Sequence, residues 1–583
     1  MKKKKIHPSD LKRLTGYLKN YKIIAVVALI FGIVSGVGTV ASTYLIGLSI
    51  DTLVGAGEVD FTALYRVLIW LGVAYLVTVL SQWLVRVLSN QVSFKIVRDL
   101  RVDTFYKLNQ LPLSFFDRTS HGNVVSRFTN DLESLSEALV LILSNLFTGV
   151  IIILASLGFM LYLSPILTLV IVLITPLFFL VGWLVAKYSQ KYFTKQQNIL
   201  GNLSGYASEM ITGQKVVKAF GYEAEMEKTF QGMNLDLYNW GQKAQFTSSV
   251  TNPASRFIDH VAYLLIGVVG GILVINGTGS VTIGTISSFV IYSSQFSKPF
   301  IEISGIMTQV QTAVAGLSRI FKIIDTPVEK QDEPDAIVLD KPQGKVDFKD
   351  VSFSYDPKTT LIEDLTISVE PGETVAIVGQ TGAGKSTLIN LLMRFYELDK
   401  GTIEIDGIDS TEYTRDSLRT SFGMVLQDTW LFNGTVKENI RYGKPDATDE
   451  EVIKAAKSAY AHSFIERLPK GYDTKLGNKG ISLSTGQQQL LTIARVMLAD
   501  PPMLILDEAT SSVDTLTEIR IQTAFLKMMD GRTSFVIAHR LSTIREADVI
   551  LVMDKGSVVE VGNHDELMKE KGFYYRLHES QFK

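Results

Sequence analysis

The distribution of apolar residues divides the chain into two parts. From about residue 20 to residue 310 apolar residues form long runs, whereas from about 340 to 583 they form the short runs typical of a soluble α/β domain. A helix needs roughly 20 apolar residues to cross the hydrocarbon core of a bilayer. Six segments meet this requirement and are predicted to span a membrane, at about 21–50, 63–88, 137–162, 165–187, 254–276 and 283–310.

The charges of the connecting segments predict how the spans are oriented. The short connection 51–62 carries acidic residues and no Lys or Arg, whereas the two long connections, near 89–136 and 188–253, are basic and helical in composition. Because cytoplasmic loops are enriched in Lys and Arg, both long connections and both termini are expected in the cytoplasm, with helices that continue beyond the membrane. Residues 9–19 alternate Leu with Lys and Arg and predict an amphipathic helix that contacts lipids of the inner leaflet.

Length and composition narrow the class of protein. A chain of 583 residues is too long for one core, so at least two domains are expected. The net charge of -2 argues against a dedicated nucleic-acid binder, and no nucleic-acid partner is expected. The chain has no cysteine, which excludes disulfides and thiolate metal sites. No short apolar region with a cleavage site begins the chain, so no removable signal is expected.

A glycine-rich loop in the second part predicts a nucleotide site. It lies between a strand-like run, 375–378, and a helical pattern, 388–395, which is the context that a phosphate-binding loop requires. Its glycines let backbone amides turn toward an anion, Lys385 can reach the β- and γ-phosphates, and Ser386 can bind Mg²⁺. The residues of this loop are Gly379, Gln380, Thr381, Gly382, Ala383, Gly384, Lys385, Ser386 and Thr387.

A second apolar strand, 504–506, presents two carboxylates at its end. Asp507 can hold Mg²⁺ through water, and Glu508 could orient or deprotonate an attacking water. The alternative for Glu508 is a structural role, as an acid that caps a helix beginning near Thr510.

The pentapeptide Leu483-Ser484-Thr485-Gly486-Gln487, about twenty residues before that strand, resembles the signature sequence of ABC ATPases. The family's usual form has Gly where this chain has Thr485. Other positions that match the family's motifs are Gln427, similar to the glutamine that touches Mg²⁺ and the coupling segments; 511–514, similar to the D-loop; His539, similar to the histidine that contacts the γ-phosphate; and Tyr355, similar to the aromatic that stacks on adenine. Ser484, Thr485, Gly486 and Gln487 would contact the nucleotide of a second chain.

The resemblance extends over the whole chain. Phe115-Phe116-Asp117 with Gly122 and 126–131 resembles the first coupling segment of ABC exporters, and Gly221-Tyr222-Glu223 with 225–230 resembles the second. The chain is therefore similar to a half-transporter of the multidrug-exporter type, as found in bacterial cell membranes. This implies an α-helical membrane domain of six transmembrane helices with long cytoplasmic extensions, residues 1–322, a linker, 323–343, and an α/β P-loop ABC ATPase domain, 344–583.

The same resemblance implies the cofactors and the partners. ATP and Mg²⁺ are expected, with ATP held between one chain's phosphate loop and the other chain's signature. A second half-transporter is thus a required partner, and the cargo is expected to be an amphipathic small molecule, a lipid or a drug.

Three departures from the family pattern bear on that second chain. Thr485 is expected to restrict both the approach to the γ-phosphate and the backbone φ, Leu490 stands where the family often has Arg, and 477–480 departs from a common Gly-Glu-Arg-Gly segment. All three are expected on the face offered to the partner's nucleotide. They favour one subunit of a heterodimer with one weakened site, while a homodimer that tolerates Thr485, such as a homodimeric lipid flippase, stays open.

Other functions on the same scaffold are an ATP-gated channel and a regulatory sensor. No regulatory insert is present between 322 and 344, which favours a pump. Charges inside spans are costly and often functional, so Lys298, Glu302 and Asp259 could face a substrate cavity. Alternatively, Lys298 and Glu302 neutralise each other near the inner leaflet.

Overall fold

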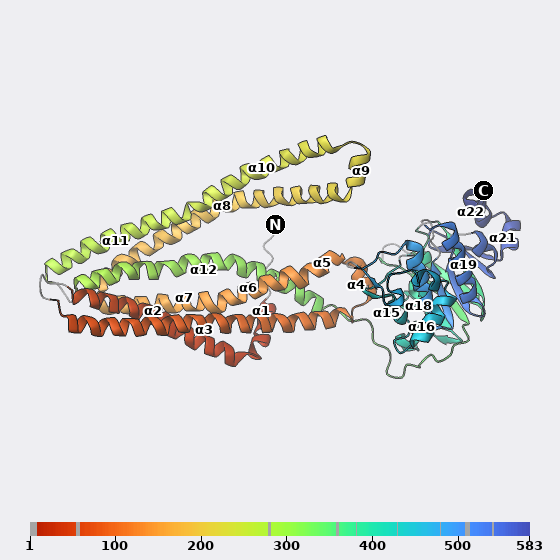
Figure 1. Cartoon of the computed structure of the whole chain (residues 1–583), viewed down its shortest axis with the longest axis horizontal. Helices are drawn as coiled ribbons and strands as arrows, with labels where there is room; N and C mark the ends of the chain where they lie inside the picture. The colour runs from red at the N-terminus through yellow and green to blue at the C-terminus, as the bar shows by residue number, and fades with distance from the viewer. Residues whose placement is uncertain are drawn as a thin grey trace. The chain divides into compact units, whose positions relative to one another are not determined.

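The computed structural model describes residues 8–53, 59–277, 281–356, 361–380, 382–427, 429–477, 480–507, 513–538 and 541–582. It divides into two compact units (Figure 1). The helical unit comprises Met1–Gln110 and Ser120–Thr326, and the sheet unit comprises Leu111–Thr119 and Pro327–Lys583. The division near Thr326 falls inside the predicted linker 323–343. Of the predicted first coupling segment, 115–117 belongs to the sheet unit, whereas Gly122 and 126–131 belong to the helical unit.

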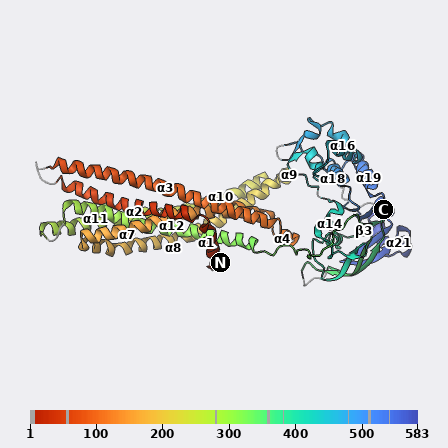
Figure 2. The same ribbon diagram turned by 90° about the horizontal axis from the view of Figure 1, so that it is seen from below.

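Long helices make up the helical unit. They are α1 (Pro8–Lys19), α2 (Lys22–Asp51), α3 (Phe61–Leu108), α5 (His121–Ser126), α6 (Leu132–Leu141), α7 (Phe147–Leu163), α8 (Pro165–Thr212), α9 (Gln214–Ala219), α10 (Glu223–Ser249), α11 (Thr251–Ile275) and α12 (Ile283–Ile324), with π-helical turns at Arg127–Asp131 and Ile142–Leu146. In Figures 1 and 2 α2 runs beside α3, with which it packs. At 48 residues, α3 is roughly 70 Å long, more than twice the thickness of a bilayer core. The predicted extension of helices beyond the membrane is therefore confirmed.

Local sequence explains where three of these helices begin. The Asp60 carboxylate accepts hydrogen bonds from the backbone N–H groups of Thr62 and Ala63 at the start of α3. Ser164 caps α8, whose first residue is Pro165, and the hydroxyl of Thr282 caps α12. Each cap satisfies backbone donors that have no partner inside the helix.

Five helical segments within the described ranges are long and apolar enough to cross a membrane: Lys22–Asp51, Phe61–Leu108, His121–Leu163, Pro165–Thr212 and Glu223–Ile275. The sixth predicted span lies in α12, whose apolar runs are interrupted by Ser and Gln, and it is not one of the five. Helices α2, α7 and α11 pack against α12, and Phe289 and Tyr292 of α12 are fully buried. Because neighbouring helices shield it, α12 needs less hydrophobicity than a helix that faces lipid; its role as a sixth span stays a prediction.

The sheet unit is built on a six-stranded sheet of order β12-β11-β3-β10-β9-β6. Its strands are β3 (Thr374–Gly379), β6 (Phe422–Val425), β9 (Met503–Asp507), β10 (Thr533–Ile537), β11 (Val549–Asp554) and β12 (Ser557–Gly562), and all but β12 are parallel to their neighbours. Since the carboxyl ends of parallel strands meet at one edge, residues that follow β3, β6 and β9 lie at the same edge of the sheet. This edge positions the candidate nucleotide site.

A four-stranded antiparallel sheet of order β2-β1-β4-β5 completes the sheet unit on one side. Its strands are β1 (Val346–Phe353), β2 (Ile362–Val369), β4 (Lys400–Ile405) and β5 (Ile408–Asp409), and a further short pair is formed by β7 (Gly434–Thr435) and β8 (Lys475–Leu476). The helices are α4 (Leu113–Arg118), α13 (Lys385–Leu392), α14 (Arg415–Thr420), α15 (Val436–Arg441), α16 (Asp449–Ser458), α17 (His462–Ile465), α18 (Thr485–Ala499), α19 (Thr515–Met529), α20 (Leu541–Arg545), α21 (His564–Glu570) and α22 (Phe573–Phe582). Figure 2 shows α16, α18 and α19 together, apart from β3 and α14.

Acidic residues of the predicted linker are anchored to the sheet unit. Asp332 forms an ion pair of 2.5 Å with the buried Arg415, and Glu329 forms one of 2.5 Å with Arg419. Ile337 continues the attachment through a β-bridge to Tyr413. The segment from Glu329 to Ile337 is therefore an ordered part of the sheet unit.

Candidate nucleotide site and membrane pocket

Glycines shape the loop between β3 and α13. Gly379, Gly382 and Gly384 have φ values of 155°, 84° and 101°, which L side chains rarely adopt. A Cβ on Gly379 would lie 2.2 Å from the carbonyl oxygen of Met553. The backbone can therefore follow this path only with glycine, and it brings the loop to the start of α13, where helix amides favour an anion. Thr381 of the predicted loop lies outside the described residues; Gln380, Ala383, Ser386 and Thr387 are placed in the loop or in the first turn of α13.

Lys385 folds back over this loop. Its Nζ donates hydrogen bonds to the carbonyl oxygens of Gly379, at 2.8 Å, and Gln380, at 3.0 Å. Burial lowers the pKa of Lys385, and the charge of Asp507 opposes this shift. Asp507 ends β9, and a single strand, β10, separates β9 from β3. The predicted phosphate-binding lysine and the predicted Mg²⁺-binding carboxylate thus belong to one site.

The oxygen atoms near this edge suit Mg²⁺. Gln427 follows β6, the neighbour of β9, and Ser386 is exposed at the second position of α13. Their amide and hydroxyl oxygens, with the carboxylate of Asp507, are the hard ligands that Mg²⁺ prefers. Glu508, His539 and residues 511–512 lie outside the described residues.

Tyr355 belongs to an aromatic cluster that also holds α4. Its ring packs edge-on against Phe353 and Tyr396, each with a centroid distance of 4.9 Å. The side-chain amide of Asn390 donates to the Tyr355 hydroxyl at 3.2 Å. From α4, the Arg118 guanidinium donates to the Tyr355 carbonyl oxygen at 3.1 Å, and the Tyr396 hydroxyl donates to the Asp117 carboxylate. The predicted adenine-stacking residue is thereby linked to the predicted first coupling segment.

The signature pentapeptide starts α18. Ser484 and Gln487 form a capping box, in which each side chain accepts a hydrogen bond from the other residue's backbone N–H, at 3.3 and 3.1 Å. A Cβ on Gly486 would lie 2.6 Å from Cγ2 of Thr517, so glycine is required here by packing against α19. Thr485 is the first residue of α18, is exposed and has no positive φ. The expectation that Thr485 restricts φ is therefore wrong, since this position has ordinary helical geometry; the side chain acts only through the space it occupies.

Leu490 does not lie on the exposed face where it was expected. It is 1% exposed and belongs to the apolar core between α18 and the sheet. Asn478 and Lys479 lie outside the described residues. Of the two departures that the structure describes in full, Thr485 is exposed and Leu490 is buried.

The sequence analysis missed Gln488, which joins the signature helix to the segment after Gln427. Its Oε1 accepts a hydrogen bond from the Thr429 hydroxyl at 3.1 Å, and its Nε2 donates to the Leu483 carbonyl oxygen at 3.1 Å. Gln488 and Thr429 are 59 positions apart, so no local sequence pattern indicates the hydrogen bond between them.

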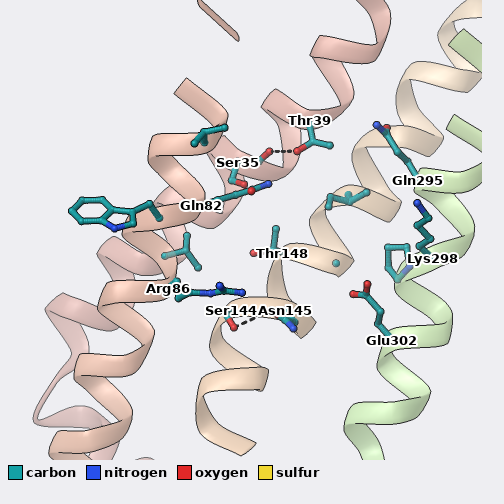
Figure 3. A pocket seen from close by; sticks show the side chains of 16 residues that line it. Ser35, Thr39, Gln82, Arg86, Ser144, Asn145, Thr148, Gln295, Lys298 and Glu302 are labelled. Carbon is teal, nitrogen blue, oxygen red and sulfur yellow. Dashed lines mark hydrogen bonds between the residues drawn. The ribbon is translucent and has the colours of Figure 1, made fainter. Parts of the chain in front are cut away.

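A pocket of about 600 Å³ lies among α2, α3, α7 and α12 of the helical unit (Figure 3). Lys298 and Glu302 line it, and in the described part of the chain they form no ion pair with each other, so the interpretation as a self-neutralising pair is not supported. Asp259 is not among its lining residues. The pocket also receives Arg86, which the sequence analysis missed although it is an arginine inside the predicted span 63–88.

Comparison with known proteins identifies related families for both the helical unit and the sheet unit. Residues 25–300 match the family model "ABC transporter transmembrane region", and residues 362–511 match "ABC transporter". The chain is 44% identical to a fatty acid ABC transporter ATP-binding/permease protein of Mycobacterium bovis, over 89% of this chain and 82% of that protein. It is 41% identical to an uncharacterised ABC transporter ATP-binding protein of Bacillus subtilis, over 98% of this chain and 94% of that one.

Among solved structures, the chain resembles a bacterial Atm1-family ABC exporter with ATP bound. The TM-score is 0.77 at 30% sequence identity, and the match covers 97% of this chain and 99% of that one. The similarity therefore includes the helical unit and the sheet unit together.

Proposed function

The chain belongs to the ABC transporter family, as a half-transporter with its membrane domain and ATPase domain on one polypeptide, and we propose from this that it exports amphipathic lipids or drugs across the cytoplasmic membrane. ATP hydrolysis in the ATPase domain is coupled to the transport. The observation that supports an amphipathic cargo is the pocket of about 600 Å³, whose lining combines charged and apolar side chains within the helical unit. The relatives are named as transporters and the solved structure as an exporter, which disfavours a channel or a sensor.

The nucleotide site supports a division of tasks among its residues. The loop from Gly379 to Thr387 would hold the phosphates, with the Lys385 ammonium released from its own loop carbonyls to bind them. Ser386, Gln427 and Asp507 would hold Mg²⁺, which neutralises phosphate charge when bound. Glu508 would take the proton of the attacking water, and His539 would contact the γ-phosphate. Tyr355 would stack on the adenine.

A second chain would complete each site. One chain carries one phosphate loop and one signature, and Ser484, Thr485, Gly486 and Gln487 would cap the nucleotide of the partner. We infer a heterodimer with a paralogous half-transporter, because Thr485 adds an exposed side chain at the tip of α18 while this chain's own loop keeps its glycines. Because Leu490 is buried, its departure from the family pattern does not support this inference.

The orientation of the chain is part of the proposal. Both termini and both long helical connections would lie in the cytoplasm, with α1 on the inner leaflet. The exposed side chain of Leu11 and the basic residues of α1 suit that position, whereas Leu14 and Leu18 pack against the core of the helical unit and do not contribute to it.

Substitution of the proposed base tests the ATPase mechanism. In the purified transporter in lipid nanodiscs, Glu508→Gln should reduce steady-state ATP turnover by roughly a hundredfold or more, the size of a lost general base, while nucleotide binding stays near wild type. Glu450→Gln, at an exposed acid of α16, is the control. Near-native turnover of the Glu508→Gln variant would show that another group accepts the proton.

A further inference from the structure

The pocket of the helical unit is lined by more positive than negative side chains. Two cations, Arg86 and Lys298, and one carboxylate, Glu302, line it. Among the described residues none of the three takes part in an ion pair or a side-chain hydrogen bond. Lys298 is near enough to Asp259 of α11 for their charges to interact, and Glu302 lies four residues further along α12. Lys298 therefore has acidic neighbours, whereas Arg86 has no acid close to it on α3.

An unpaired arginine inside a membrane-spanning helix is costly and is retained where it has a function. Arg86 lies on α3 in the predicted span 63–88, and its side chain extends into the pocket near Ser144 and Asn145 (Figure 3). The guanidinium presents several N–H donors in one plane, a geometry that matches a carboxylate or a phosphate. A carboxylate or a phosphate of a ligand would therefore suit Arg86 as a hydrogen-bond partner.

Further polar atoms of the pocket also lack partners. Ser35 lines the pocket and is buried, and its Oγ has no hydrogen-bond partner in the described part of the structure. Gln295 uses its Nε2 to donate to the Thr43 hydroxyl at 2.8 Å, and its buried Oε1 has no partner there either. Buried polar atoms without partners are rare in folded proteins, and here they occur at a cavity large enough to hold a ligand.

The remaining lining provides an apolar surface beside the charges. Val79, Trp83 and Val85 lie on α3 within two turns of Arg86, and Ile152 of α7 and Pro299 of α12 add to this surface. A ligand that fits would have a charged head at Arg86 and an apolar chain along these side chains.

We propose that Arg86 binds the anionic head group of an amphipathic cargo, a carboxylate or a phosphate on an acyl chain, and that Glu302, which faces Arg86 from the opposite side of the pocket, opposes this binding. The inference rests on the proposed export of amphipathic molecules and specifies the class of cargo. Loss of the Arg86 charge and loss of the Glu302 charge should then have opposite effects on the affinity for an anion.

The test compares ligands that share one chain and differ in head-group charge. Oleate, oleamide and oleylamine are titrated separately against the complete transporter in nanodiscs. Ligand binding and stimulation of ATP turnover are the two readouts. A fourth ligand, lysophosphatidic acid, distinguishes a phosphate from a carboxylate. The wild type should bind oleate or lysophosphatidic acid more tightly than oleamide and oleylamine. The better of the two anions identifies the head group.

Variants then assign the preference to residues. Arg86→Gln should weaken binding of the anion roughly tenfold or more, as expected for a lost charged hydrogen bond, and leave oleamide binding nearly unchanged. Arg86→Lys should recover part of the affinity, and Glu302→Gln should strengthen anion binding and weaken that of oleylamine. Arg66→Gln, on the same helix but outside the pocket, is the matched control and should behave as wild type.

The outcomes separate this inference from the proposed function. Equal binding of all head groups, or the same effect of Arg86→Gln and Arg66→Gln, would overturn the role of Arg86 while export of amphipathic molecules stands. An unchanged anion affinity in Glu302→Gln would overturn the role of Glu302, and this variant remains informative if Arg86→Gln does not fold. Failure of every amphiphile to bind a transporter with active, Glu508-dependent ATP turnover would refute the proposed cargo and this inference together.

Discussion

Thr485 and Gly486 are neighbours at the start of α18, but different physical constraints act on them. Gly486 is buried, and any side chain there would collide with Thr517 of α19. Thr485 is exposed and has an ordinary helical backbone, so threonine costs the fold little. The substitution therefore affects what the helix tip can approach, which is a partner's nucleotide in the proposed assembly.

This difference predicts the effect of restoring glycine. In a heterodimer whose partner keeps the usual signature, Thr485 caps the slower of the two sites. Thr485→Gly should therefore change ATP turnover by less than about twofold. Lys385→Ala, by contrast, should nearly abolish turnover. Thr485→Ala is the matched control, since it removes the same bulk without the helix cost of glycine, roughly 1 kcal/mol. A large rise in turnover for both variants at 485 would indicate that Thr485 caps every site, as in a homodimer.

Sites formed by residues that are contiguous in sequence could be predicted, whereas contacts between residues far apart in sequence could not. The phosphate loop was predicted because strand, glycines and helix are contiguous. The Gln488–Thr429 hydrogen bond and the burial of Leu490 depend on how α18 lies against the rest of the unit, which no local pattern records. Arg86 is a different case, since its charge inside an apolar segment was visible in the sequence.

At the scale of elements, α4 shows how a short segment can belong to a unit distant in sequence. Local signals predicted helix starts, such as the caps at Asp60 and Ser164, because cap and helix are adjacent. The attachment of α4 is different, because its Asp117 accepts from Tyr396, 279 positions away. The resemblance to coupling segments suggested a role for α4, and the structure adds the residues that hold it.

The attachment predicts a coupling defect when the Tyr396 hydroxyl is removed. Burial, followed by the hydrogen bond to Asp117, raises the pKa of Tyr396, so the phenol stays protonated and can donate at neutral pH. Tyr396→Phe should therefore lower cargo-stimulated ATP turnover severalfold, because α4 is held less firmly, while the affinity for ATP changes little. The hydrogen bond is worth about 1 kcal/mol.

Tyr460→Phe is the control for this prediction, since Tyr460 is an exposed tyrosine in another part of the sheet unit. Turnover and nucleotide affinity are measured in parallel, with and without the cargo amphiphile. Equal loss of basal and stimulated turnover would mean that the hydroxyl stabilises the unit as a whole and has no specific part in coupling.

At the scale of the whole molecule, exposed apolar surfaces indicate where a second chain would bind. On α9 and directly after it, Val216 and Phe220 are 61% and 82% exposed, and in the sheet unit Trp430 and Tyr442 are each 61% exposed. Exposed aromatic residues of this size mark interaction sites more often than free surface. α9 directly precedes the predicted second coupling segment, so we expect Val216 and Phe220 to bind the aromatic surface of a partner's ATPase domain.

The last prediction concerns the identity of that partner. Each chain has one phosphate loop and one signature, so the proposed assembly needs two chains for two composite sites, and Thr485 is expected to weaken the site that this chain caps. When this chain, carrying the only affinity tag, is co-expressed with a paralogous half-transporter from the same genome, purification should yield a one-to-one complex by native mass spectrometry. That complex should hydrolyse ATP at least severalfold faster than this chain purified alone. If a homodimer of this chain forms in the presence of the paralogue and shows full turnover and transport, the heterodimer is refuted and Thr485 must be compatible with an active site.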